Sequence, residues 1–300
     1  MKRVIAVGLA VMDKIFGVAD LPREATKVFA NSYREIGGGP AATAAVAVSR
    51  LGGQAGLWAR VGEDAVGRRI IEELLEWGVA PCVRSVPGAL SNVSGVLVDS
   101  MGERLIISYT DPGLDADPSW LPLEDLATAD AVLVDVRWPQ ASAAVLKHAR
   151  HLGVPTVLDA DLAPDDVVQQ LVPLADFAVF SKPALFQMSG VNDLQEALLR
   201  ISHQTPGHVG VTIGQNGFAW LEGSTLQREP GFRVTVVDTL GAGDVFHGAF
   251  ALALAEGNNI RKAAQFANGA SALKCTRPGG RAGIPVREEV ERLLITEGAV

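Results

Sequence analysis

Short runs of apolar, often β-branched residues recur along the chain with Ala- and Leu-rich stretches between them, and this alternation constrains the fold more than any other feature. The clearest runs are residues 4–7, 131–136, 156–158, 177–180 and 209–213. Strands that are apolar throughout and alternate with helices are typical of a mostly parallel sheet covered by helices on both faces. The sequence therefore predicts an α/β fold.

Two segments depart from this alternation, because their polar and apolar residues interleave without a convincing helix. Residues 15–36 and 91–109 predict antiparallel strands of a small second sheet. We expect this sheet to act as a lid, with strands contributed by about 14–36 and 91–112. The chain shows no internal repeat, low-complexity segment or linker, so we expect one domain over residues 1–300 with the lid inserted into it.

Charge and composition exclude several classes of function. The net charge is −8 and no block of five or six basic residues occurs, so we expect neither nucleic acid nor an anionic membrane as a partner. No apolar run approaches the ~20 residues of a membrane-spanning helix, and the first residues have the pattern of a strand and not of a signal peptide, which favours a cytoplasmic protein. Cys82 and Cys275 lack the spacing of a disulfide framework or a zinc site, so we expect reduced thiols and no protein-built metal site.

A glycine-rich turn, Asp-Thr-Leu-Gly-Ala-Gly-Asp, occupies residues 238–244 between an expected strand at 234–237 and an apolar helix expected from Val245. The N–H groups that open a helix have no intrahelical acceptor, and the helix dipole favours negative charge there, so such a turn is an anion site. We assign Gly241, Ala242 and Gly243 to stabilising a transferring phosphoryl group. Phe246 replaces the third glycine of a dinucleotide-binding turn, and no Walker P-loop occurs.

Asp244 closes this turn beside the predicted anion site. A carboxylate there is placed to take the proton of a substrate hydroxyl as that hydroxyl attacks a phosphorus atom. The alternative role is a simple cap of the following helix. The whole seven-residue turn resembles the C-terminal signature of the ribokinase-like (PfkB) carbohydrate kinases. This resemblance implies a ribokinase-like fold and phosphoryl transfer from ATP, with Mg²⁺ bridging the phosphates, to a sugar hydroxyl through Asp244.

A second part of the family signature lies near the N-terminus. Glycines 37 to 39 and Pro40 precede a run of small residues that predicts a closely packed helix, and by itself this pattern is also that of a plain structural turn. The resemblance implies that Gly38 and Gly39 form the lid hinge and contact the sugar. Asp13 follows the first strand and resembles the family aspartate that holds two sugar hydroxyls; the alternative is a solvated turn carboxylate.

The predicted nucleotide site comes from the C-terminal half. The segment from Thr212 to Gly217 resembles the Thr-x-Gly-x-x-Gly nucleotide loop of the family, which implies ATP contacts for Thr212, Gly214 and Gly217. Asn268 begins a segment that resembles the one flanking the adenine. Many relatives have Asn-x-x-Glu where this chain has Ser-Lys-Pro-Ala at 181–184. We therefore expect the ATP phosphates, and not the protein, to hold most of the Mg²⁺ shell.

Three residues bear on the choice of sugar. Arg137 directly follows an expected strand, at the carboxyl end where α/β proteins bind ligands, and Lys27 lies in the expected lid. Such a pair suits an anionic group at the far end of the sugar, and the alternative is a surface arginine paired with an aspartate. The stretches 37–46, 135–138, 241–248 and 272–285 resemble the sulfofructose kinases of sulfoglycolysis. There an arginine, a lid lysine and an asparagine hold the sulfonate; the matching positions are Arg137, Lys27 and Ser108.

The leading hypothesis is phosphorylation of the C1 hydroxyl of 6-deoxy-6-sulfofructose by ATP. A kinase of another ketose or acidic sugar, such as fructose or 2-keto-3-deoxygluconate, is the alternative. A third possibility is a sugar-sensing protein that keeps the fold without turnover; the missing Asn-x-x-Glu prompts it, and the intact turn ending at Asp244 opposes it. We also expect a homodimer formed through the lid strands.

Overall fold

A nine-stranded sheet forms the centre of the computed structural model, which describes residues 1–298. Its neighbouring strands are parallel except at one edge, where β12 is antiparallel to both β11 and β13. The strand order is β13, β12, β11, β10, β9, β8, β1, β4 and β5. The bounds are β1 Arg3–Val7, β4 Gln54–Gly62, β5 Ala80–Val86, β8 Ala131–Asp135, β9 Thr156–Ala160, β10 Phe177–Ser181, β11 His208–Thr212, β12 Phe218–Glu222 and β13 Thr225–Glu229.

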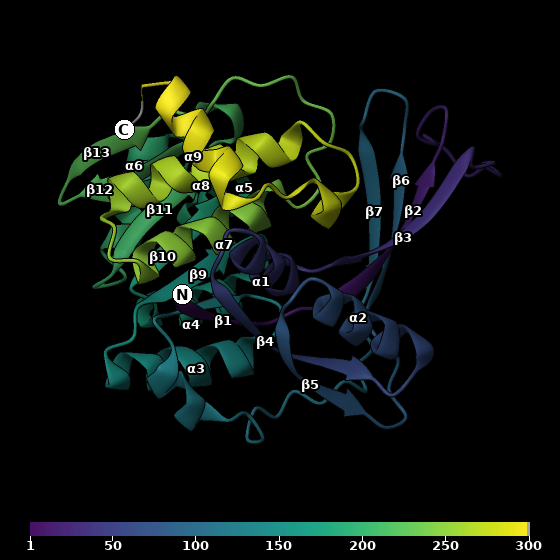
Figure 1. The fold of residues 1–300 in the computed structure, drawn as a ribbon, viewed down its shortest axis with the longest axis horizontal. Helices are drawn as coiled ribbons and strands as arrows, with labels where there is room; N and C mark the ends of the chain where they lie inside the picture. The colour runs from purple at the N-terminus through teal and green to yellow at the C-terminus, as the bar shows by residue number, and fades with distance from the viewer. Residues whose placement is uncertain (299–300) are drawn as a thin grey trace.

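Helices cover both faces of this sheet (Figure 1). Alternate strand residues point to opposite faces, so Ala6 joins the core beneath α1, α2, α7, α8 and α9, whereas Ile5 joins the core beneath α3 to α6. The predicted α/β class is confirmed. The helices are α1 Pro40–Arg50, α2 Ala65–Glu76, α3 Pro139–Leu152, α4 Asp165–Leu171, α5 Lys182–Ser189, α6 Leu194–Ser202, α7 Ala242–Ala255, α8 Ile260–Cys275 and α9 Arg287–Thr296, with short 3-10 turns η1 Leu123–Thr128, η2 Val172–Leu174, η3 Gly214–Asn216 and η4 Gly280–Gly283.

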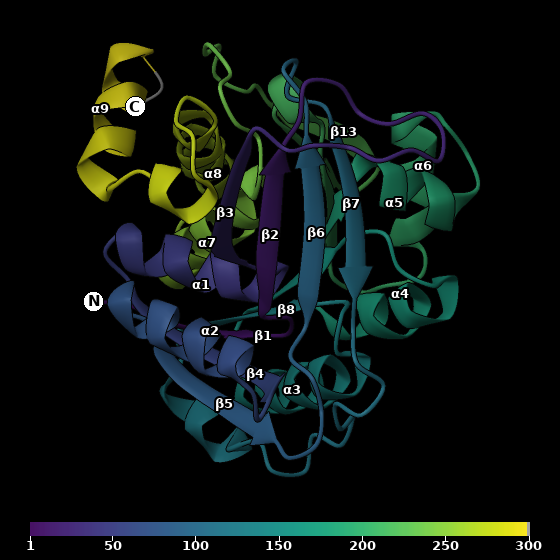
Figure 2. The ribbon, with the colours of Figure 1, turned by 90° about the vertical axis from the view of Figure 1, so that its right-hand side faces the viewer.

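A separate four-stranded sheet stands beside this body, and Figure 2 shows it face-on. Its order is β3 (Ser32–Gly38), β2 (Val11–Gly17), β6 (Val93–Val98) and β7 (Arg104–Tyr109). The prediction that all its strands are antiparallel is wrong, because β2 and β6 are parallel. Both strands leave the body from the same side, β2 after β1 and β6 after β5, so they run in the same direction (Figure 2).

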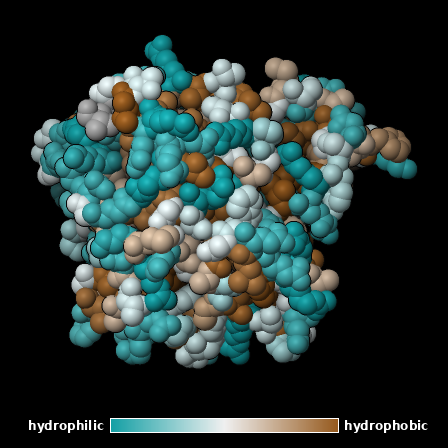
Figure 3. Space-filling view, in the orientation of Figure 1, coloured by the Kyte–Doolittle hydropathy of each residue, from teal (hydrophilic) through white to brown (hydrophobic). Residues whose placement is uncertain are grey.

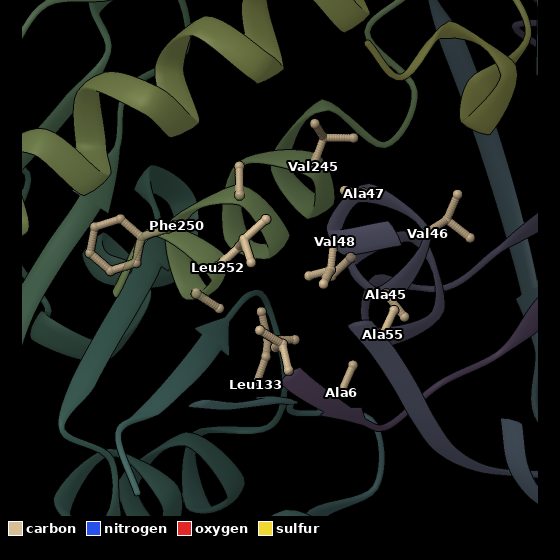
Figure 4. Packing of buried hydrophobic residues seen from close by; sticks show 14 of the residues in the cluster. Ala6, Ala45, Val46, Ala47, Val48, Ala55, Leu133, Val245, Phe250 and Leu252 are labelled. Carbon is tan, nitrogen blue, oxygen red and sulfur yellow. The ribbon is translucent and has the colours of Figure 1, made fainter. Parts of the chain in front are cut away.

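The small-residue helix predicted after the glycines is α1, and it packs directly on α7 (Figure 4). A Cβ atom on Gly248 of α7 would lie 2.4 Å from the carbonyl oxygen of Ala44 in α1. Only glycine permits this backbone approach. Because α7 carries the predicted phosphate turn and α1 follows the predicted hinge glycines, this packing fixes two parts of the site relative to each other.

The strand expected at residues 234–237 is absent, and this segment has no regular structure and pairs with no sheet strand among the described residues. The backbone N–H groups of Val237 and Asp238 instead donate to the carbonyl oxygen of Cys275 at the end of α8. Val236 and Val237 are 60% and 57% exposed, so the β-branched run is not a buried strand. The phosphate turn is therefore entered from a loop that α8 holds in place.

No helix within residues 1–298 is long and apolar enough to span a membrane. Hydrophilic side chains cover most of the face shown in Figure 3, with hydrophobic side chains in smaller patches. Cys82 and Cys275 are both free thiols.

Candidate active site

The phosphate turn leads into α7 three residues earlier than predicted, at Ala242 and not at Val245. Gly241 is the N-cap residue; it has a φ of 75° and makes no side-chain cap. This left-handed conformation is one that glycine adopts without strain. Asp244 therefore lies inside the first turn, and it is not the N-cap that the alternative interpretation required. The N–H of Ala242 donates to the carbonyl oxygen of Thr239 within the turn. A helix start leaves further N–H groups without an intrahelical acceptor, and these suit an anion.

Asp244 has an unusual protonation equilibrium. Burial and the negative charge of Asp159 raise its pKa to about 7, while His247 acts in the opposite direction. A group with a pKa near the working pH is best suited to take a proton and release it again. The site thus gives Asp244 the property that a general base needs.

A buried pair lies beneath Asp244, on the next turn of α7 and at the end of β9. The Nδ1 atom of His247 is 2.8 Å from the carbonyl oxygen of Gly243 and 3.5 Å from an oxygen of Asp159. Burial lowers the pKa of His247, and burial together with the charge of Asp161 raises the pKa of Asp159 well above its usual range. Both groups therefore belong to the electrostatic environment of Asp244.

The first of two pockets beside Asp244 contains the residues predicted to bind sugar. Asp13 lies on β2, where it accepts a hydrogen bond from the Ser94 hydroxyl, so it is not the solvated turn carboxylate of the alternative interpretation. Burial raises the Asp13 pKa, and the bond from Ser94 opposes this. A Cβ on Gly38 would lie 2.2 Å from Asp13, which explains the glycine. The pocket is lined by Asp13, Ile36, Gly37, Gly38, Gly39, Thr43, Leu240, Gly241, Asp244, Gly280 and Arg281.

The second pocket lies on the other side of the phosphate turn and has a volume of about 580 Å³. It brings together all four predicted nucleotide residues, and Ala242 and Gly243 also line it. The Asn268 side chain donates to the carbonyl oxygens of Glu229 and Pro230, so it also holds the end of β13 against α8. The lining residues are Thr212, Gly214, Gln215, Asn216, Gly217, Gly231, Phe232, Arg233, Val234, Val236, Thr239, Ala242, Gly243, Phe246, Asn268, Ser271, Ala272 and Cys275.

The three residues predicted to hold a sulfonate do not line the pocket that contains Asp13. Arg137 is 37% exposed and forms a 3.3 Å ion pair with Asp161, as the alternative interpretation described. Lys27 lies between β2 and β3, with its ammonium 5.3 Å from the centre of the Phe29 ring. Ser108 is in register with Ser94, the residue that contacts Asp13. The structure therefore leaves their joint role a prediction.

Comparisons with known proteins settle the family. The model of the pfkB family carbohydrate kinases matches residues 1–287. The chain belongs to this family. Two pockets separated by an anion-binding turn are what an ATP-dependent sugar kinase needs, one for each substrate. The prediction of a ribokinase-like carbohydrate kinase is confirmed.

Named relatives cover nearly the whole chain of this kinase. The ribokinase of Bacillus subtilis is 30% identical over 300 residues, covering 98% of this chain and 100% of its own. A solved structure from Agrobacterium tumefaciens that carries a provisional ribokinase name is 42% identical, with a TM-score of 0.95 and 100% and 99% coverage. Arabidopsis thaliana ribokinase, solved with ribose and ATP, is 27% identical, with a TM-score of 0.86 and 98% coverage of both chains.

A Mg²⁺ ion that arrives with ATP would need few ligands from the chain itself. No group of three or more His, Cys, Asp or Glu side chains within residues 1–298 is arranged to hold a metal ion. Ser181, at the start of the segment that lacks Asn-x-x-Glu, donates to Asp161 and caps α5. Mg²⁺ commonly keeps several waters and binds through phosphates and one or two carboxylates. Asp161, whose side chain is 40% exposed and whose charge acts on Asp244, would suit such a contact.

Asp238, the first residue of the phosphate turn, joins the turn to the small sheet, although sequence reasoning gave it no separate role. One carboxylate oxygen accepts from Arg104 of β7 at 2.6 Å and from the Leu240 N–H at 2.9 Å. The fully buried ammonium of Lys274 donates to its carbonyl oxygen at 2.8 Å. Burial opposes ionisation of Asp238, but the Leu240 hydrogen bond and the charges of Lys274 and Arg104 lower its pKa. Asp238 is thus held as a carboxylate between two cations.

Proposed function

We propose that Asp244 takes the proton of a sugar hydroxyl while that oxygen attacks the γ-phosphorus of ATP. The new O–P bond forms as the bond from the γ-phosphorus to the β–γ bridging oxygen breaks, and ADP leaves with the electrons of that bond. The N–H groups at Gly241 to Gly243 stabilise the charge on the transferring group. The observation that carries the proposal is the place of Asp244 in the first turn of α7, between the two pockets and with a pKa of about 7.

We further propose that the pocket around Asp13 binds the sugar and that the pocket around Asn268 binds ATP. Asp13 suits this role because a carboxylate accepts hydroxyl hydrogens, and Gly38 and Gly39 leave the backbone open beside it. Thr212, Gly214 and Gly217 line the larger pocket next to the phosphate turn. Mg²⁺, when bound with ATP, neutralises charge on the phosphates.

The proposed sugar is 6-deoxy-6-sulfofructose, phosphorylated on its C1 hydroxyl. Support comes from the resemblance to sulfofructose kinases and from Arg137, whose backbone N–H is held by Asp135 at the carboxyl end of β8. The other oxygen of Asp135 accepts from the N–H groups of Leu9 and Ala41, so Arg137 is tied to the start of α1. The ion pair with Asp161 must open for Arg137 to meet a sulfonate.

Ribose is the second candidate, because the relatives named above are ribokinases. A neutral pentose would leave the Arg137–Asp161 pair undisturbed. A spectrophotometric assay of ADP release separates the candidates when it compares kcat/KM for sulfofructose, fructose, fructose 6-phosphate, 2-keto-3-deoxygluconate and ribose. Sulfofructose should give the highest value. A higher kcat/KM for ribose or for fructose 6-phosphate would refute the sulfosugar assignment and leave the sugar kinase intact.

We also propose that the small sheet is a lid and that two copies of the chain associate through it. Tyr33, Ile107 and Tyr109 share its outward face by register and are 55%, 67% and 45% exposed. Exposed apolar groups on one sheet face suit an interface. Sedimentation equilibrium should give a dimer for the wild type and a monomer for Ile107→Lys. A monomeric wild type at micromolar concentration would refute the dimer.

A further inference from the structure

Arg281 is a buried cation in the pocket around Asp13, and the transfer of the phosphoryl group described above does not use it. Its side chain is 2% exposed, and it lines the pocket together with Asp13 and Asp244. It comes from η4, near the end of the chain, whereas its main contacts come from the first 73 residues. A charge that is buried in this way needs a role or a partner.

The guanidinium has protein partners for part of its hydrogen-bonding capacity. It donates to the carbonyl oxygen of Gly38 at 2.8 Å, to Glu73 at 3.3 Å and to the Thr43 hydroxyl at 3.4 Å. Glu73 in turn accepts from the Gly37 N–H at 2.8 Å. An arginine carries five N–H donors and no acceptor. Three of the five therefore have acceptors within residues 1–298.

The negative charges around Arg281 favour the protonated guanidinium, which is a hydrogen-bond donor beside the pocket. Burial lowers its pKa, but the negative charges of Glu73, Asp13 and Asp244 oppose this. Glu73 pairs with Arg281 directly, whereas Asp13 and Asp244 share the pocket with it without a hydrogen bond to it. Among residues 1–298, Arg281 is the only cationic residue that lines this pocket. An uncharged oxygen of a ligand placed between the two aspartates would therefore find its cationic hydrogen-bond donor in the guanidinium.

We propose that Arg281 is a specificity-determining residue of the sugar pocket, where its remaining N–H bonds donate to oxygen atoms of the bound sugar. This rests on the proposed assignment of that pocket to the sugar. The sugar must then present an oxygen that accepts a hydrogen bond, such as a hydroxyl, ring or carbonyl oxygen. This oxygen must lie between the sugar hydroxyls that Asp13 binds and the sugar hydroxyl that Asp244 deprotonates. An amino sugar with its ammonium at that point is rejected, because it brings a second cation and no acceptor.

The test compares Arg281→Met and Arg281→Lys with Arg277→Met as a matched control. Arg277 also forms an Arg–Glu pair, at 2.6 Å to Glu289, but it does not line either pocket. The sugar is whichever one the wild type phosphorylates best, so the result does not depend on the sulfosugar assignment. We expect Arg281→Met to lower kcat/KM for the sugar by roughly 10², with the ATP KM changed by less than about twofold. Arg281→Lys should fall between Arg281→Met and the wild type, and the control should match the wild type.

The double variant Arg281→Met/Glu73→Gln distinguishes a purely structural role of Arg281 from a role in sugar recognition, because it leaves no unpaired charge buried. Thermal unfolding should show that it recovers stability relative to Arg281→Met, while kcat/KM for the sugar stays low. Recovery of sugar use by the double variant, or an unchanged kcat/KM in Arg281→Met, would overturn the proposal. If Arg281→Met does not fold, the double variant and Arg281→Lys carry the same comparison. If Asp13→Ala leaves sugar affinity unchanged, the assignment of this pocket to the sugar is wrong. That outcome is distinct from a failure of the Arg281 proposal, in which Asp13→Ala weakens sugar binding but Arg281→Met does not.

Discussion

Replacing Asp244 with Asn tests both the chemistry and the electrostatics of the site. The amide keeps the shape of the side chain but cannot take a proton from the sugar. General base catalysis contributes typically 10² to 10⁴ in rate. We therefore expect kcat to fall by at least about 10² while ATP affinity, measured by calorimetry, stays within a few-fold.

The same substitution should make the kinase more stable at alkaline pH. The pKa of Asp244 rises from 3.8 to about 7 on folding, so between these values the folded state keeps a proton that the unfolded state loses. The free energy of unfolding of the wild type therefore falls as pH rises through this range. A shift of about 3 units at 1.36 kcal/mol each gives ~4 kcal/mol as an upper bound, since the carboxylate keeps contact with solvent in the pocket. Asn carries no such penalty.

Urea unfolding of the wild type and Asp244→Asn at pH 5, 7 and 9 measures this difference. The stability gained by the variant should be about a third of its full value at pH 5, should grow as pH approaches 7 and should level off above about pH 8. The wild-type kcat/KM should rise over the same range as Asp244 loses its proton. A gain in stability that is equal at pH 5 and pH 9 would refute the raised pKa, and near-normal turnover of the folded variant would refute the catalytic assignment.

Four further substitutions test other parts of the site. Asp13→Ala should weaken sugar binding by roughly 10- to 10²-fold and spare ATP, and unchanged sugar affinity in calorimetry would contradict its role. Arg137→Ala should lower kcat/KM for sulfofructose by roughly 10², with little effect on fructose and a smaller effect from Lys27→Ala; equal losses for both sugars would contradict anion recognition. Arg104→Ala should speed hydrogen exchange of β6 and β7, because it removes the contact between the small sheet and Asp238, and unchanged exchange would show that this contact does not hold the sheet.

Five of the nine strands that residues 1–298 form in the large sheet were predicted, because burial acts locally on them, whereas β4, β5, β12 and β13 were not predicted. Each of the five apolar runs corresponds to a strand whose ends differ from the prediction by no more than two residues. The exception is the run at 234–237, where β-branched residues lie in an exposed loop that bonds to α8. Local composition cannot distinguish these cases, because strand propensity depends on what the strand packs against.

The site was predictable only where its residues belong to a contiguous turn. Asp244 and its neighbours were found from seven consecutive residues, and the structure places them between the two pockets. Arg281 and Glu73 were missed because 208 residues separate them, and because the resemblance over residues 272–285 gave Arg281 no role of its own. The two glycines before Arg281 were the signal that could have drawn attention to it. His247 could have been found, since it lies three residues after Asp244 on the same helix face.

The ammonium of Lys274 gives the phosphate turn a counter-ion that cannot leave. An ion drawn from solution would occupy a site beside Asp238 only for a fraction of the time, and that fraction would change with the salt around the protein. Lys274 is a fully buried residue of α8 whose ammonium donates to the carbonyl oxygen of Asp238. Burial lowers the pKa of Lys274, and the negative charge of Asp238 opposes this. Buried pairs are also screened much less by salt than exposed ones. The chain itself therefore supplies the positive charge at the start of the turn, and we expect the turn to depend little on the salt around the protein.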